Sequence, residues 1–254
     1  MRLLFMHLAT SAAVGLTSLL LLTGCPVMAA NYHSARTLPR GEQNWGMNFS
    51  ASAVQSTDRD AGRPWASQAS VVIPEVTLHH GLSDDWEVGG RFGLLRLGGE
   101  GDIKYRFASP GNWHLALGAA VSLQVGSLNG ANLQIPLLMT WEYSRETRFT
   151  LSLSASGSAV SPEDSNLAGL QGVLAAAGGS FGVEFVDDSV SIRPGIEAMY
   201  YVTGASRPSG MERPFAVVGV VVHVSQTGSP PSVIETFRTI KGFFKKPRND
   251  DSDD

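Results

Sequence analysis

Cysteine is almost absent from this sequence. Cys25 is the only cysteine among 254 residues, so no disulfide can form within the chain. A free thiol would be a reactive liability in an exported protein. The preceding residues, Leu22-Thr23-Gly24, complete a lipobox, in which the thiol is consumed by acylation. The single cysteine therefore indicates a lipid attachment site.

Long apolar runs are missing after residue 25, and so is an excess of positive charge. No later stretch approaches the roughly 20 apolar residues that a membrane-spanning helix needs. Any spanning structure in the mature chain must consist of strands. The net charge of −4 and the pI near 5.9 argue against nucleic acid as a partner. Charged residues make up only 17% of the chain, against 43% hydrophobic residues, which is unusual for a soluble domain.

The first 24 residues are interpreted as a signal peptide. Arg2 provides the positive start, and an apolar stretch runs from Leu3 to Leu22. Two cleavage signals follow, the lipobox at Cys25 and a signal-peptidase site at Val27-Met28-Ala29 that would remove the cysteine. We expect lipidation, and Pro26 in place of an inner-membrane retention aspartate favours the outer membrane. An uncleaved transmembrane helix is the alternative.

From Gln43 onward, hydrophobicity alternates with a period of two, as in β-strands. In residues 113–125, for example, the odd-numbered positions are apolar or alanine and the even-numbered positions are small or polar. The pattern predicts an all-β fold, an antiparallel up-and-down transmembrane β-barrel of about ten strands. The strands are expected near residues 43–56, 69–80, 85–96, 99–107, 112–126, 130–143, 148–160, 169–185, 189–203 and 213–224.

The connections between these strands alternate in character. Tight polar turns are expected at 81–85, 109–112, 144–148 and 186–189, and longer or glycine-rich links elsewhere, such as 57–68, 161–168 and 204–212. Barrels with short turns at one end and longer loops at the other produce such an alternation. The predicted organisation is a signal peptide (1–24), a linker (25–42), the barrel (43–225) and a helical or disordered tail (226–254).

Aromatic residues gather near the short-turn ends of the predicted strands, on their apolar faces. A soluble sandwich core would not sort them to one end. Amphipathic rings prefer the membrane–water interface, so the pattern predicts an aromatic girdle made of Trp45, Trp86, Tyr105, Phe107, Trp113, Trp141, Tyr143, Phe149 and Phe185.

Charged residues and histidines fall on the opposite, inward face, mostly in the half nearer the short turns. We expect an ion-paired network that fills a narrow lumen. A solute-selecting channel lining and an acid–base site are the two functional alternatives. The predicted set comprises Glu75, His79, Glu87, Arg91, Asp102, Lys104, Arg106, His114, Glu142, Glu184, Arg193 and Glu197.

Catalytic and cofactor motifs are missing. The sequence has no lipase-type G-x-S-x-G, no H-E-x-x-H and no Walker loop. His79 and His80 are neighbours on a strand and point to opposite faces, so they cannot chelate one metal. Residues 98–101, GGEG, are interpreted as a glycine-rich turn with no following helix to bind phosphate. We expect no enzyme activity, no metal and no cofactor.

Three short segments resemble bacterial outer-membrane β-barrel proteins, especially poorly characterised ones that begin as lipoproteins. The segments are SARTLPRGEQNWGMNFS, PEVTLHHGLSDDWEVGGRFG and GEGDIKYRF. Such families often begin ARTL followed by glycine, then continue with a strand and a G-L-(S/T)-D turn. The resemblance covers about half the chain and supports the fold more than any activity. One departure is the C-terminus, which continues about thirty residues past Val224 instead of ending on an aromatic residue.

The sequence therefore predicts an outer-membrane lipoprotein with a structural, adhesive or minor transport role. Membrane lipid is the expected partner, with both termini in the periplasm. The tail could lie on anionic lipid, bind an envelope protein, or cap the periplasmic mouth of the barrel. The alternative is a soluble, periplasm-facing β-sandwich lipoprotein that binds a ligand or protein partner.

Overall fold

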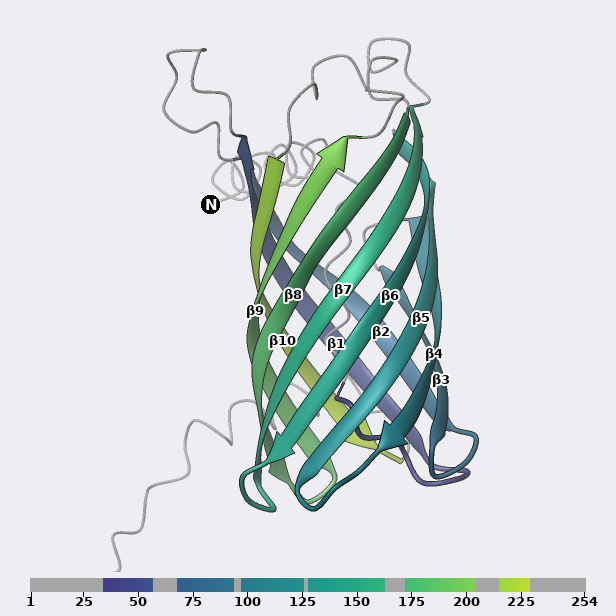
Figure 1. Cartoon of the computed structure of the whole chain (residues 1–254), viewed down its shortest axis with the longest axis vertical. Coiled ribbons are helices and arrows are strands. Elements are labelled where there is room, and N and C mark those ends of the chain that lie inside the picture. Colours follow the sequence, from purple (N-terminus) through teal and green to yellow (C-terminus); the bar gives the residue numbers. More distant parts are fainter. Residues whose placement is uncertain are drawn as a thin grey trace, which may run out of the picture.

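The computed structural model describes residues 34–56, 68–93, 97–125, 128–162, 172–203 and 215–228. Ten antiparallel strands form one closed barrel (Figure 1). They are β1 (Gln43–Ser56), β2 (Gln68–Gly81), β3 (Trp86–Gly93), β4 (Leu97–Ala108), β5 (Trp113–Val125), β6 (Leu128–Glu142), β7 (Thr147–Pro162), β8 (Gly172–Asp187), β9 (Val190–Thr203) and β10 (Phe215–Thr227). The predicted strand number and up-and-down order are confirmed, and the sandwich alternative is wrong because the sheet has no free edge.

Each strand pairs with its neighbours in the chain, and β1 closes the barrel by pairing with β10. At this seam Asn44 lies opposite Thr227 and Ser56 opposite Phe215. The amide of Gly228 donates to the carbonyl of Gln43 at 2.9 Å. The start of β1 and the end of β10 therefore lie together, at the end of the barrel that carries the short turns.

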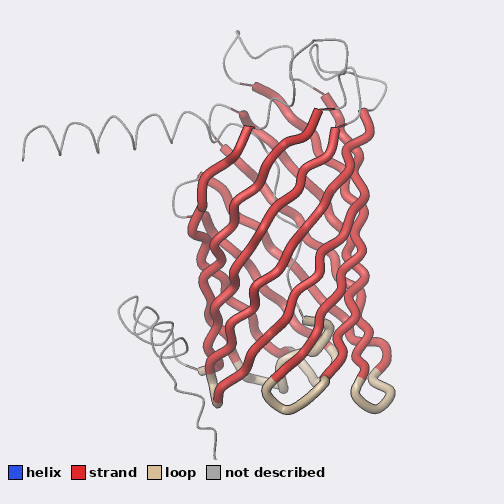
Figure 2. The backbone as a smooth tube through the Cα atoms, turned by 90° about the vertical axis from the view of Figure 1, so that its left-hand side faces the viewer, coloured by secondary structure: helices blue, strands red, loops and turns tan. Residues whose placement is uncertain are grey.

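Four short turns connect the strands at that end, as Figure 2 shows in tan. They comprise residues 82–85, 109–112, 143–146 and 188–189. In the tightest of them, Asp188 adopts a φ of 51°, a conformation that two-residue hairpin turns require. At the other end the predicted alternation is not strict. Residues 94–96 and 126–127 separate their strands by as little as the short turns do.

The outside of the barrel is apolar and its inside is polar, because successive side chains on a strand point to opposite faces. Large hydrophobic side chains such as Leu123, Leu153 and Ile196 are more than half exposed. Small residues, including Ser122, Ser152 and Ala176, are buried in the interior. Charged residues are buried nearer the short turns. This polarity is the reverse of a water-soluble fold.

Among the described residues there is no helix long and apolar enough to cross a membrane.

Candidate functional site

The twelve polar residues predicted for the inward face all lie in the interior of the barrel, which we call the lumen. Nine of them are buried, and Asp102, Arg106 and Glu142 are partly exposed. They come from β2 to β6, β8 and β9, and ten of them take part in three groups of ion pairs. The carboxylate of Glu197 lies beside Gly219 of β10, where the missing side chain leaves room for it.

The first group centres on Arg91 of β3. Its Nη2 lies 2.8 Å from Oε2 of Glu100, and its Nη1 lies 3.5 Å from Oε2 of Glu75. The side-chain amide of Asn48 donates to the same Glu75 oxygen at 3.1 Å. The side chain of Glu100 has no exposed surface. One guanidinium thus holds two buried carboxylates in place.

The second group lies between β2, β3 and β4. Nζ of Lys104 is 2.9 Å from Oε1 of Glu87. Nδ1 of His79 is 3.4 Å from the same oxygen and 3.8 Å from Oδ1 of Asp102. The imidazole lies over Gly89, where a Cβ atom would overlap the ring. This glycine is what allows His79 to reach both carboxylates.

The third group connects β5 to β9. Glu184 accepts from Arg193 at 2.7 Å and from Arg148 at 3.4 Å. Arg148 also lies 3.4 Å from Glu142, which in turn is 3.5 Å from Nε2 of His114. Two carboxylates and two guanidiniums therefore alternate along the wall. Arg106, by contrast, pairs with Asp85 in the β2–β3 turn at 3.0 Å, at the rim of the barrel.

Residues Ser34–Pro39 lie inside the short-turn end of the lumen, where the sequence predicts only a linker. We call these six residues the lumen segment. Ala35 has no exposed surface and packs against Ala116 and Leu138. The segment leaves the lumen over Gly81, where a Cβ would collide with the carbonyls of Leu38 and Pro39. The barrel wall is shaped to receive it.

Most contacts of the lumen segment use its backbone. The amide of Ala35 donates to Oγ1 of Thr140 at 2.8 Å, and the amide of Leu38 donates to Oε2 of Glu87 at 2.9 Å. Nζ of Lys104 donates to the carbonyls of Ser34 and Arg36 at 3.0 and 2.7 Å. These four bonds hold the backbone of the segment in place.

Three side chains of the segment add to these contacts. The hydroxyl of Ser34 lies 3.2 Å from Oγ1 of Thr140. The hydroxyl of Thr37 donates to the carbonyl of Asp84 in the β2–β3 turn. The guanidinium of Arg36 lies 3.1 Å from Oε1 of Glu142, which joins the segment to the third group. Burial and the neighbouring Arg148 lower the pKa of Arg36, while Glu142 opposes this effect. Arginine nevertheless stays protonated in proteins, so the pair is ionic.

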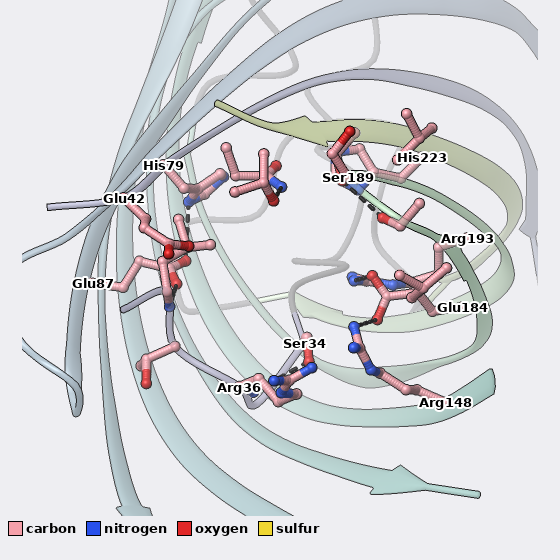
Figure 3. A pocket seen from close by; sticks show the side chains of 18 of the residues that line it. Ser34, Arg36, Glu42, His79, Glu87, Arg148, Glu184, Ser189, Arg193 and His223 are labelled. Carbon is pink, nitrogen blue, oxygen red and sulfur yellow. Dashed lines mark hydrogen bonds and ion pairs between the residues drawn. The ribbon is translucent and has the colours of Figure 1, made fainter. Parts of the chain in front are cut away.

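A cavity of about 270 Å³ separates the lumen segment from the wall of β8, β9 and β10. Arg36 and Ser34 border it on one side, and Arg193 and His223 on the other (Figure 3). Most of its lining is polar or charged. Water can therefore approach the contacts of the segment from this side.

The nine aromatic residues of the predicted girdle all point away from the lumen, near the short-turn end. Several touch across neighbouring strands. The rings of Trp86 and Tyr105 stack at a centroid distance of 4.6 Å. Trp141 stacks on Trp113 at 5.7 Å and on Phe149 at 5.6 Å. The rings thus form pairs and short rows around the barrel.

Among the lumen residues described above, four with an ionisable side chain escape the sequence prediction. Glu100 is missed because GGEG is interpreted as a turn, which is wrong, since these residues lie within β4. Its parity with Asp102 could have revealed it. Counting alternate residues along β7 and β10 would also have placed Arg148 and His223 on the inward face. Arg36 precedes the first strand, so no periodicity marks it.

The signal peptide, Cys25 and most of the tail lie outside the described residues. Among the residues that are described, no three His, Cys, Asp or Glu side chains are grouped so that they could hold a metal ion.

No family model and no curated protein sequence matches this chain. Solved structures of similar fold include an outer-membrane channel from Pseudomonas putida F1, 12% identical, with 80% of this chain and 100% of that chain covered and a TM-score of 0.41. The NanC porin is 7% identical over 73% of this chain and 100% of its own, with a TM-score of 0.42. The outer membrane protease OmpT from Escherichia coli is 9% identical over 76% and 99%, with a TM-score of 0.36. Likeness at this level does not carry a channel, porin or protease activity over to this chain.

Proposed function

We propose that this protein is a transmembrane barrel of the bacterial outer membrane, with a structural or minor transport role and a lumen closed at rest. The reversed polarity of the barrel carries this proposal. Side chains such as Phe92, Leu123 and Leu153 are 64%, 59% and 56% exposed on the outside, whereas Glu87 and Arg91 are buried inside. An apolar outer band of this kind is stable in lipid and would aggregate in water.

The orientation follows from the short turns. Bacterial barrels have short turns on the periplasmic side, so the lumen segment and the end of β10 would face the periplasm. The stacked pairs that include Trp86, Trp113 and Trp141 would then mark the periplasmic membrane interface, where amphipathic rings are favoured.

The closed lumen is supported by its nearly balanced charge. The interior positions described above provide seven acids and six bases: Glu75, Glu87, Glu100, Asp102, Glu142, Glu184 and Glu197, against Arg36, Arg91, Lys104, Arg106, Arg148 and Arg193. Balanced charges can pair across a narrow interior, and the lumen segment occupies part of the remaining space. No residue is assigned a catalytic role.

A lipid anchor at Cys25 is the finer part of the proposal. Its support is the lipobox and the lack of any other cysteine. Nine residues lead from Cys25 to Ser34, and an extended chain of this length spans about 30 Å. That reach is long enough to join an acylated cysteine in the periplasmic leaflet to a segment just inside the barrel mouth. The tail is proposed to contact lipid or an envelope protein on the same side.

Two measurements test the barrel and its closed state. On a gel, protein from purified outer membranes should migrate differently before and after boiling, as folded barrels do. In planar bilayers the wild type should show little or no conductance. Identical mobility together with release by salt would refute the membrane barrel, and a large steady current would refute the closed lumen.

A further inference from the structure

We propose that the short-turn end of the lumen is a binding site for an extended peptide carrying one guanidinium, and that the lumen segment occupies this site reversibly. This inference goes beyond the closed barrel, because the lumen segment is proposed to dissociate from its site and bind again. It also assigns a ligand class to the lumen.

Several contacts of the site are with the peptide backbone. Thr140, Glu87 and Lys104 bind amides and carbonyls, which every peptide offers in extended form. Selectivity for charge comes from one position, where Glu142 faces the guanidinium of Arg36. A small side chain is favoured at another position, because Ala35 has no exposed surface and packs against Ala116 and Leu138.

The wall remains paired when the segment leaves. Lys104 and Glu87 keep each other at 2.9 Å, and Thr140 keeps a hydroxyl contact with Thr150 at 3.2 Å. Glu142 keeps Arg148 at 3.4 Å. Loss of an ion-pair partner is costly when it leaves a buried charge unpaired. Departure of the segment leaves each of these charges with a partner in the wall.

Little apolar surface holds the segment in place. Ala35 is its only fully buried hydrophobic side chain, while Leu38 is partly exposed and Pro39 exposed. Burying one methyl group stabilises the segment only weakly, so most of the stabilisation comes from hydrogen bonds, of which those with Lys104 and Glu87 are charge-assisted. The adjoining cavity of about 270 Å³ gives water a path to these bonds. A permanent plug would need a larger apolar anchor.

Thiol labelling of the full-length protein in detergent tests the exchange. In a Cys25→Ser background, Ala35→Cys places a thiol where no surface is exposed, so a water-soluble maleimide can react only after the segment leaves. Thr37→Cys provides a second probe position if the first variant does not fold. We expect labelling faster than global unfolding. A synthetic peptide of residues 34–39 should accelerate it by occupying the vacated site.

A matched pair of variants tests the guanidinium contact. Arg36→Glu places a carboxylate opposite Glu142 and should accelerate labelling by roughly fivefold to tenfold. Arg40→Glu makes the same charge change one residue beyond the segment, on an exposed side chain, and should have little effect. A peptide with glutamate in place of its arginine should compete poorly.

The proposal is overturned if labelling occurs only as fast as global unfolding, or if neither peptide changes its rate. Equal effects of Arg36→Glu and Arg40→Glu would refute the assigned guanidinium contact. These measurements need no membrane or current. A conducting wild-type barrel would therefore refute the proposed function without deciding this inference.

Discussion

Arg91→Met should destabilise the barrel strongly, because Arg91 holds two buried carboxylates. At an effective dielectric constant of 20, the contacts of 2.8 and 3.5 Å correspond to about 6 and 5 kcal/mol of gross attraction. Desolvation cancels much of this. Breaking a buried pair on one side typically costs about 3–5 kcal/mol, since the remaining charge stays buried. We expect a loss in this range, because the Glu100 side chain has no exposed surface and Glu75 lies close by.

Unfolding by urea in detergent micelles, followed by tryptophan fluorescence, measures this loss. Arg145→Met is the control, because Arg145 is exposed in the 143–146 turn and should change the free energy of unfolding by less than about 0.5 kcal/mol. Arg91→Met combined with Glu75→Gln and Glu100→Gln should recover most of the stability. A loss below about 1 kcal/mol for the single variant, or no recovery in the triple variant, would show that water screens this group.

Three further substitutions test other parts of the molecule. Gly89→Ala should cost about 1–3 kcal/mol of unfolding free energy by displacing the imidazole above it, whereas Gly101→Ala meets open space and should be neutral; equal costs would contradict the packing. Leu153→Arg should cost about 2–4 kcal/mol in vesicles, and Leu82→Arg in a turn about 0–1; similar values would refute the lipid-facing assignment. Cys25→Ser should abolish labelling by a radioactive fatty acid, and unchanged processing would show that the lipobox is not used.

The fold is predictable from this sequence because an alternation of period two determines which residues of each strand face outward and which face the lumen. In β5 and β7, every other residue is apolar, and a shift by one residue would turn all of them into the lumen. Strand ends are less well determined. β10 continues to Thr227, whereas the sequence predicts its end near residue 224, where the apolar residues stop.

The pairing inside the lumen is harder to predict, because it depends on the stagger between strands. Arg91 and Glu100 can be placed on the inward face by counting, but their contact follows only from the register of β3 with β4, in which they lie opposite each other. The lumen segment has no periodicity at all. This short stretch before the first strand has the composition of a linker. Its position in the lumen becomes apparent only from the structure of the closed barrel.

The contacts of the lumen segment also bear on how the barrel assembles. Its hydrogen-bonding and ionic partners in the barrel wall, from Asp84 to Glu142, belong to the first six strands or their turns. The seam between β1 and β10 is the one pairing that joins distant parts of the chain, and distant pairings are late events in folding. The segment can therefore bind to a half-built, still open sheet. When β10 then pairs with β1, the barrel closes around a segment that is already bound. The segment does not have to enter a barrel that is already closed.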